Sequence, residues 1–484
     1  MRCYEKPNDH LIFPPSISSL RRRSIMKKLL IVFIVLLLAA LALSACGGNT
    51  TSTQAPTAEQ PKAEQPKAEQ PKAEEPKQEA PSAEKVTLRV WTHQNNAFNE
   101  GYQALADKYM AEHPNVEITF ETFDYDTYIQ TLQTAMPAGT EADVLQMFGS
   151  WVCSYAEGGN LDVVPESVIS LNDAQAKIMA APIGGYVCDG KLYGIPQEFN
   201  IEYGAVLVNT QLADEKDATG YKDGWADWDE FIQDAKKLVE TQDGVMTRAG
   251  FNFTSADGIA TMFHSLILQY GGQYLQDGQY KVTTPEGQKT LALMKRFIDE
   301  GLVDPVLFND EENWVGDSYF EGTSAIGLVG PWVIPEYSGD YPDVVKVTQY
   351  VRLPSVGEKP VFAAASGWGL TVSANSKVKD AAWDFVKFVT LNADNATEWN
   401  LASGTLPALK DNVSGDNAKK LVEQFPYFEP FLGLLQYGQF EGHFPDRDFV
   451  WYEVTYPEVL NFLQGNATAD ETLKNIEDAV NGSF

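Results

Sequence analysis

A proline at every fifth position divides this chain into a short N-terminal region and a long globular one. Pro-Lys-Ala-Glu-Gln occurs at Pro61 and again at Pro66, and Pro-Lys-Ala-Glu-Glu follows at Pro71. Regularly spaced prolines interrupt helices, and a segment without large apolar side chains cannot build a core. We therefore expect residues 46–85 to contain a disordered, solvated linker, with folding beginning just after it.

The region before the linker has the features of a secretory signal. An apolar run at 29–42 follows two lysines and ends at residues 43–46, Leu-Ser-Ala-Cys. A basic start, a moderate apolar run and small residues are typical of a signal peptide rather than of a membrane-spanning helix. Because Leu-Ser-Ala-Cys resembles the bacterial lipobox, we predict that Cys46 is lipidated. Residues 1–45 would then form the signal region. Within this region, Met26 is a more natural start of translation than Met1. An ordinary signal peptide with a chance cysteine is the alternative.

Length and charge limit the number of lobes and the classes of partner that the chain can have. The 400 residues from Lys85 to Phe484 exceed what one core usually serves, so two lobes are expected. The net charge of −31 argues against nucleic acid and against anionic lipid headgroups as partners, because both would be repelled. The same charge disfavours a strongly anionic ligand.

The cysteines and histidines suggest a disulfide and no metal centre. Cys153 and Cys188 form an even pair in a chain expected outside the cytoplasm, so we predict a disulfide between them; two buried free thiols are the alternative. The five histidines show no metal-ligand spacing. No cofactor or metal is expected.

The apolar periodicity predicts an α/β fold. Alternating patterns indicate strands at 86–91, 116–120 and 143–148, and helical spacing indicates helices at 98–109 and 128–136 between them. This order implies right-handed crossovers and a largely parallel, helix-covered sheet. Further helices are expected at 228–238 (with Asp227 as N-cap), 291–298, 381–389, 456–463 and 471–480, and short strands at 325–329 and 370–372.

Six short motifs are spread over nearly the whole globular region, at 107–116, 138–144, 190–196, 228–231, 320–332 and 381–408. They include Gly-Lys-Leu-Tyr-Gly-Ile-Pro at 190–196, Trp-Asp-Glu-Phe at 228–231 and Gly-Pro-Trp at 330–332. Each is weak alone, but their order resembles that in the extracellular solute-binding proteins of sugar ABC transporters (family 1, maltose-binding type). The chain departs from that family's pattern at Ala142, where proline is usual.

This resemblance implies a two-lobed, periplasmic-binding-protein-like fold of type II, whose lobes are joined by crossing hinge strands. Mapped by motif, lobe 1 would comprise 86–200 and 365–405, and lobe 2 would comprise 201–364 and 406–484. The crossings would fall near 199–203, near 361–366 and after Leu406. The resemblance also implies a monomeric receptor that closes on its ligand and delivers it to permease subunits of an ABC transporter.

Candidate binding residues follow from the chemistry of sugars. A sugar site needs aromatic platforms for C–H faces and planar polar groups for hydroxyls, on loops after the carboxyl ends of strands. Such positions are occupied by Gln94, Asn95, Ser150, Trp151, Glu198, Asn200, Trp332, Gly367 and Trp368.

Each candidate also has a structural alternative. The tryptophans could be core residues, Trp151 could pack beside a disulfide, and the polar residues could form turns or interlobe hydrogen bonds. We expect His93 to be structural. Arg447 could reach a ligand hydroxyl, but we expect it to form a surface ion pair. Helical spacing places Trp228, Trp383 and Trp399 in the core.

The sequence lacks the common catalytic motifs. Neither Gly-x-Ser-x-Gly nor His-Glu-x-x-His nor a Walker or EF-hand loop occurs. We therefore predict a non-enzymatic, lipid-anchored, extracytoplasmic receptor for a neutral sugar, tethered to the membrane by lipid alone. A secreted carbohydrate-active hydrolase is the alternative, because abundant aromatic and acidic residues suit it too. An adhesion module on a stalk would explain the linker but not the six motifs.

Overall fold

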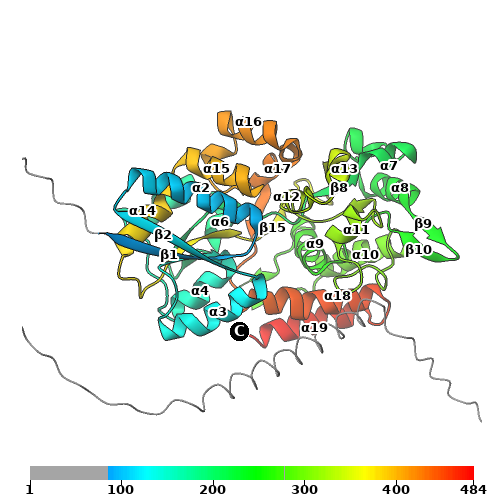
Figure 1. The fold of residues 1–484 in the computed structure, drawn as a ribbon. Helices are drawn as coiled ribbons and strands as arrows, with labels where there is room; N and C mark the ends of the chain where they lie inside the picture. The colour runs from blue at the N-terminus through cyan, green and yellow to red at the C-terminus, as the bar shows by residue number, and fades with distance from the viewer. Residues whose placement is uncertain (1–84, 277) are drawn as a thin grey trace, which may run out of the picture. The chain divides into compact units, whose positions relative to one another are not determined.

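The computed structural model describes residues 85–276 and 278–484 (Figure 1). The predictions for the signal region, for Cys46 and for the linker up to Glu84 lie outside these residues. Within the described part, none of the helices combines the length and the apolarity needed to cross a bilayer.

A five-stranded sheet combines strands from both chain segments of the predicted lobe 1, 86–200 and 365–405. Its order is β2 (Val116–Phe123), β1 (Val86–His93), β3 (Val144–Phe148), β16 (Trp368–Val372) and β6 (Gly194–Pro196). β1 is parallel to β2 and β3, whereas β16 is antiparallel to both β3 and β6. The prediction of a largely parallel sheet is right for β1, β2 and β3, and β6 runs in the same direction as they do; only β16 runs the opposite way. β16 arrives from a distant part of the chain, so the rule for β-α-β crossovers does not fix its direction.

Helices α2 (Asn96–Glu112), α3 (Tyr125–Ala138), α14 (Lys379–Thr390) and α15 (Ala393–Ser403) accompany this sheet. In Figure 1 the yellow and orange α14 and α15 lie beside the blue α2, although nearly 300 residues separate them. α3 continues through Pro137 and ends at Gly139, whose φ of 66° gives the left-handed C-cap that glycine favours.

A second, three-stranded sheet has the order β13 (Ile326–Gly327), β8 (Ala205–Asn209) and β14 (Thr348–Arg352), and all its pairs are antiparallel. The strand expected at 325–329 is thus only two residues long. The helices of this half include α8 (Trp228–Leu238), α9 (Ala256–Gln269), α10 (Pro285–Asp299), α18 (Tyr456–Leu463) and α19 (Ala469–Asn481). Asp227 caps α8 as predicted, accepting a hydrogen bond from the backbone N–H of Glu230.

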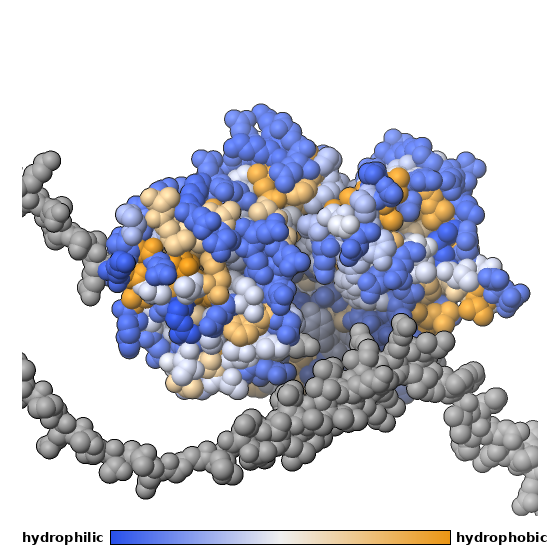
Figure 2. All heavy atoms as spheres, viewed as in Figure 1, coloured by the Kyte–Doolittle hydropathy of each residue, from blue (hydrophilic) through white to orange (hydrophobic). Residues whose placement is uncertain are grey.

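The two sheets enclose separate hydrophobic cores. One core is built mainly from residues 88–195 and 368–409, and the other mainly from 199–364 and 421–480. Trp228, Trp383 and Trp399 are buried in these cores, as predicted, with exposed fractions of 6%, 2% and 1%. On the face shown in Figure 2, hydrophilic residues cover most of the surface.

Two short strand pairs lie where the chain passes between the cores. β7 (Glu198–Phe199) pairs antiparallel with β17 (Leu406–Pro407). β15 (Phe362–Ala364) pairs parallel with β18 (Gly438–Phe440), a strand that the sequence analysis did not include. These segments bring residues 198–202, 362–368 and 405–407 close to one another.

A disulfide joins Cys153 in α4 (Gly149–Glu157) to Cys188 in β4 (Val187–Cys188), with an Sγ–Sγ distance of 2.05 Å. Its formation in the living cell stays a prediction. In the described ranges, no three His, Cys, Asp or Glu side chains are grouped so that they could hold a metal ion.

Candidate functional site

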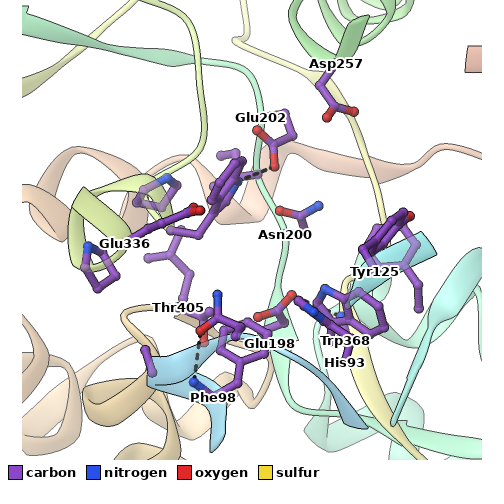
Figure 3. A pocket seen from close by; sticks show the side chains of 18 of the residues that line it. His93, Phe98, Tyr125, Glu198, Asn200, Glu202, Asp257, Glu336, Trp368 and Thr405 are labelled. Atoms are coloured by element: carbon purple, nitrogen blue, oxygen red, sulfur yellow. Dashed lines mark hydrogen bonds between the residues drawn. The ribbon is translucent and has the colours of Figure 1, made fainter. Parts of the chain in front are cut away.

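A cavity of about 1190 Å³ lies where segments from both cores meet (Figure 3). Its walls come from the β1–α2 connection at 93–98, the extended segment at 198–202, the start of α9, the turn at 331–340, Trp368, Thr405 and the region around Arg447. The walls therefore combine residues that are far apart in sequence and that belong to both sheets.

Six of the nine predicted binding residues line this cavity: Gln94, Asn95, Glu198, Asn200, Trp332 and Trp368. The other three, Ser150, Trp151 and Gly367, do not. Most of the predicted residues therefore lie in the wall, whereas the two after β3 and the glycine before β16 do not.

Ser150 and Trp151 miss the cavity because β3 runs directly into α4 rather than into a loop. The helix begins at Gly149. Trp151 packs edge to face on Trp368, with ring centroids 5.3 Å apart, and its Nε1 donates a hydrogen bond of 3.2 Å to Asp448 Oδ2. Trp151 is therefore a residue that supports the cavity wall from behind.

Gly367 has a backbone role next to the cavity. Its φ of 70° lies in the region that glycine favours, and a Cβ there would come within 2.9 Å of Glu198 Cγ and 3.2 Å of Asn200 Cβ. The absence of a side chain at Gly367 lets the crossing segment that carries Glu198 and Asn200 pass close to β16.

An aromatic wall stands on the side of the five-stranded sheet. The rings of His93 and Trp368 lie 4.6 Å apart with an interplanar angle of 37°, and Phe148 and Tyr125 contact Trp368 edge to face. Burial lowers the pKa of His93 to about 4, so its ring is neutral at pH 7. His93 is a packing residue, as expected, but it also lines the cavity.

Trp332 lies on the opposite side, on the turn before α12 (Val333–Tyr337). Its indole stacks on Trp314, with centroids 6.0 Å apart and an interplanar angle of 24°. Its Nε1 donates a hydrogen bond of 2.7 Å to Glu202 Oε1, and the Gly330 backbone N–H donates one of 2.9 Å to Oε2 of the same carboxylate. Glu202 therefore fixes both the ring and the turn that carries it.

Glu202 is a cavity residue that the sequence analysis missed, although a signal was present. Glu198, Asn200 and Glu202 alternate along an extended segment, so that every second side chain points to the same side. In Figure 3, Asn200 lies between Glu198 and Glu202 on this segment. Continuing the alternation from Glu198 and Asn200 by two residues would have identified Glu202 from the sequence.

Glu198 is buried with 4% of its surface exposed. Its Oε1 accepts a hydrogen bond of 3.0 Å from the Trp368 backbone N–H, whereas its Oε2 is buried without a donor among the described residues. Burial raises the pKa of Glu198 to about 7. This carboxyl therefore takes up a proton close to neutral pH when nothing else compensates its charge.

A second group of carboxyls surrounds the first turn of α9. Asp257 accepts a hydrogen bond of 2.9 Å from the Tyr452 hydroxyl, and Asp310 Oδ2 accepts one of 3.1 Å from the Ala256 backbone N–H. Burial raises the pKa of Asp257, and burial together with the Asp257 charge raises the pKa of Glu202. The pKa of Asp310 rises to about 6 for the same two reasons. No local pattern in the sequence joins these three residues.

Arg447 does not form the surface ion pair that the sequence suggested. It is buried with 5% exposed, and its Nε pairs with Glu441 Oε1 at 3.2 Å. Its Nη1 donates 2.9 Å to the Tyr452 hydroxyl and lies 3.4 Å from Asp448 Oδ1, while Cζ lies 4.5 Å from the Trp451 ring centroid. The prediction failed because the π-helical turn η5 (Phe449–Thr455) folds Trp451 and Tyr452 back over the guanidinium.

Comparison with known proteins gives a consistent result. Residues 95–396 match the family described as bacterial extracellular solute-binding protein. The maltotriose-binding protein of Pyrococcus abyssi is 25% identical over 377 residues, which cover 75% of this chain and 74% of that protein. A binding protein of Brucella abortus is 23% identical over 376 residues, covering 77% of this chain and 87% of its own length.

The solved structure of the cyclic α-maltosyl-1,6-maltose binding protein from Arthrobacter globiformis superposes with a TM-score of 0.67 at 23% identity. It covers 82% of this chain and 99% of that one. This likeness confirms the predicted two-lobed α/β fold of type II.

Proposed function

Because the chain belongs to the bacterial extracellular solute-binding protein family, we propose that it captures a carbohydrate in the cavity between its lobes and delivers it to the permease of an ABC importer. Two similar proteins are named for glucose oligomers, maltotriose and a cyclic maltosyl-maltose. A carbohydrate is therefore the first class of ligand to test.

The observation that carries this proposal is the pair of tryptophans on opposite walls of one cavity. Trp332 and Trp368 belong to different cores, and polar groups of Glu198 and Asn200 lie on the segment between them. Indole faces suit the C–H faces of sugar rings, and carboxylate and amide groups suit the hydroxyls at their edges. A volume of about 1190 Å³ leaves room for more than one sugar ring.

Lobe boundaries at 86–200 with 365–405, and at 201–364 with 406–484, fit this proposal. The strand pairs β7–β17 and β15–β18 would then act as hinge segments, since hinges are usually a few residues at the ends of elements. Closure about them would bring Trp332 and Trp368 together on the ligand.

The rest of the proposal concerns the place of the protein in the cell. A lipid on Cys46 would hold a monomer at the outer side of the membrane, and the proline-rich linker would let the lobes reach the permease. The apolar run and the lipobox-like residues before Cys46 support this arrangement.

A thermal-shift screen of carbohydrates tests the function. A true ligand at 100 times its dissociation constant adds about 2.7 kcal/mol to the free energy of unfolding and raises the melting temperature. At the same ligand concentration, Trp332→Ala should reduce the stabilisation to about 1 kcal/mol or less, whereas the core variant Trp228→Phe should lower the melting temperature but keep the full shift. A panel of mono- and oligosaccharides in which none shifts the melting temperature would contradict the proposal.

A further inference from the structure

Two neighbouring contacts join the lobes directly beside the cavity, and together they form a clasp. The indole Nε1 of Trp151, in α4, donates a hydrogen bond of 3.2 Å to Oδ2 of Asp448. The Arg447 guanidinium lies over the Phe148 ring, with Cζ 5.9 Å from the ring centroid. Trp151 and Phe148 pack against the core of the five-stranded sheet. Arg447 and Asp448 come directly before η5, whose Trp451 belongs to the other core.

Each partner of the Trp151–Asp448 hydrogen bond is fixed within its own lobe. α4 follows β3 without a loop, and Cys153, two residues beyond Trp151, is bonded to Cys188 of β4. On the other side, Asp448 Oδ1 lies 3.4 Å from Nη1 of the buried Arg447. Because both side chains belong to fixed elements, this hydrogen bond depends on how the two lobes are placed.

Other tryptophans use the indole N–H within a single lobe. Trp383 Nε1 donates a hydrogen bond of 2.9 Å to Asp162 Oδ2, and Trp225 Nε1 donates one of 3.1 Å to Asp234 Oδ2. Trp151 instead reaches a carboxylate 297 positions away, in the other lobe. A hydrogen bond within one lobe stabilises that lobe. The bond of Trp151 contributes to the free-energy difference between two arrangements of the lobes.

The position of the clasp decides which arrangement it favours. Phe148 and Arg447 both line the cavity, and they contact each other from different lobes. A movement that widens the cavity here separates these two groups and lengthens the neighbouring hydrogen bond from Trp151 to Asp448. Losing a hydrogen bond to a charged acceptor is unfavourable even after water replaces it. The clasp therefore favours the closed arrangement of the lobes, whether or not a ligand is bound.

Building on the proposed function, we propose that Trp151 is a positioning residue for ligand binding, whose hydrogen bond to Asp448 holds the lobes closed. Neither of these two residues lines the cavity. The Trp151 ring also packs edge to face on Trp368, with centroids 5.3 Å apart, so it supports the aromatic wall as well. Because a ligand held between the lobes binds the closed arrangement more tightly, the population of that arrangement sets the apparent affinity. Trp151 thus acts through the lobes and through Trp368, and not by the direct contact that the sequence suggested.

The distance between the lobes in the ligand-free protein tests the clasp directly. Spin labels at Ala104→Cys in α2 and Asp343→Cys in α13 (Pro342–Lys346) place one label on each lobe, at exposed positions. Trp151→Phe removes the indole N–H and keeps an aromatic ring beside Trp368. Electron–electron double resonance on the purified full chain in detergent measures the label distances. The ratio of open to closed populations should rise about three- to tenfold in Trp151→Phe.

Trp383→Phe is the matched control. It removes an indole N–H that is bonded to an aspartate within one lobe, so it should lower the melting temperature and leave the label distances unchanged. Asp448→Ala removes the other partner of the clasp and should lengthen the distances as Trp151→Phe does. Because the two residues form one contact, their effects should not add in the double variant. Labelling without reductant preserves the bond between Cys153 and Cys188.

Calorimetric titration with maltotriose extends the test to binding. Trp151→Phe should weaken the affinity about three- to tenfold, and Trp383→Phe should leave it unchanged. Distances that stay the same or shorten in both Trp151→Phe and Asp448→Ala would overturn the clasp. Longer distances with unchanged affinity would overturn the role of Trp151 in binding. If the wild type does not bind maltotriose, the label distances alone decide the clasp, and the missing affinity counts against the proposed function only.

Discussion

The indole Nε1 of Trp332 donates a hydrogen bond of 2.7 Å to Oε1 of Glu202, a carboxyl whose other oxygen accepts from the Gly330 backbone. The glutamate thus locks the aromatic ring to the segment that crosses between the cores. Burial raises the pKa of Glu202, and its indole and backbone donors lower it. An aromatic platform held in this way presents a fixed face to a ligand.

Trp332→Ala should reduce carbohydrate affinity by more than about 30-fold, since removing a buried aromatic anchor typically costs 2 kcal/mol or more. Its effect on the melting temperature should be smaller than that of Trp368→Ala, because Trp368 is 8% exposed and packs against His93 and Phe148. Calorimetric titration and thermal melting of both variants measure the two effects. Unchanged affinity with a large loss of stability would assign Trp332 to packing.

Arg447→Ala should destabilise the protein by about 3–5 kcal/mol, because it leaves the buried Glu441 carboxylate without its partner. Lys346→Ala is the matched control. It breaks an ion pair with Asp343 in which the two side chains are 71% and 91% exposed, and it should change stability by less than about 1 kcal/mol. Urea unfolding measures both. Equal effects of the two variants would show that the Arg447 network contributes no more than a surface pair.

The raised pKa of Glu198 makes stability depend on pH. The folded state, with a pKa of about 7, binds a proton that the unfolded state, near 4.5, has lost, so this group lowers stability as pH rises from 4.5 to 7. His93 acts in the opposite direction between about 4 and 6.5, because its folded pKa is depressed.

Comparison of Glu198→Gln with the wild type isolates the first effect. The variant should gain stability relative to the wild type as pH rises through this window, and the gain should level off above pH 7. Urea unfolding at several pH values measures this difference. A stability difference independent of pH would show that Glu198 does not titrate as described.

The bond between Cys153 and Cys188 should stabilise the fold by about 3–4 kcal/mol in the chain-entropy model, because the two residues are 35 positions apart. Alkylation of the denatured, unreduced protein should label neither cysteine, and reduction should make both reactive. Quantitative labelling of both cysteines before reduction would rule out the bond.

Cys46 should carry lipid in the mature protein, and Cys46→Ala should accumulate as unprocessed precursor or be released from the membrane. Mass spectrometry of the mature N-terminus tests this prediction directly. A mature wild-type chain without lipid on Cys46 would contradict the anchor.

The sequence predicted these helices and strands well, because apolar periodicity and capping residues are local features of the sequence. The Asp227 cap, the helix at 456–463 and the first three strands all follow from periodicity and capping. The family match further confirms that the chain is a binding protein rather than an enzyme, and it gives the hydrolase alternative no support.

The errors concern features that depend on tertiary contacts. The antiparallel insertion of β16 and the burial of Arg447 are decided by segments far away in sequence. For Asn95, the sequence analysis predicted one of two roles. It lines the cavity as predicted, but its Oδ1 also caps α2 by accepting from the Phe98 N–H at 3.1 Å, a role that asparagine before a helix often has.

The central claim is that a carbohydrate binds in the cavity between Trp332 and Trp368. Its most direct test is calorimetric titration of the purified chain with maltotriose, cellotriose and chitotriose, repeated on Trp332→Ala. We predict saturable binding of at least one of them to a single site, lost or weakened more than about 30-fold in the variant. Absence of binding to all three, or equal affinity in the wild type and Trp332→Ala, would contradict the claim.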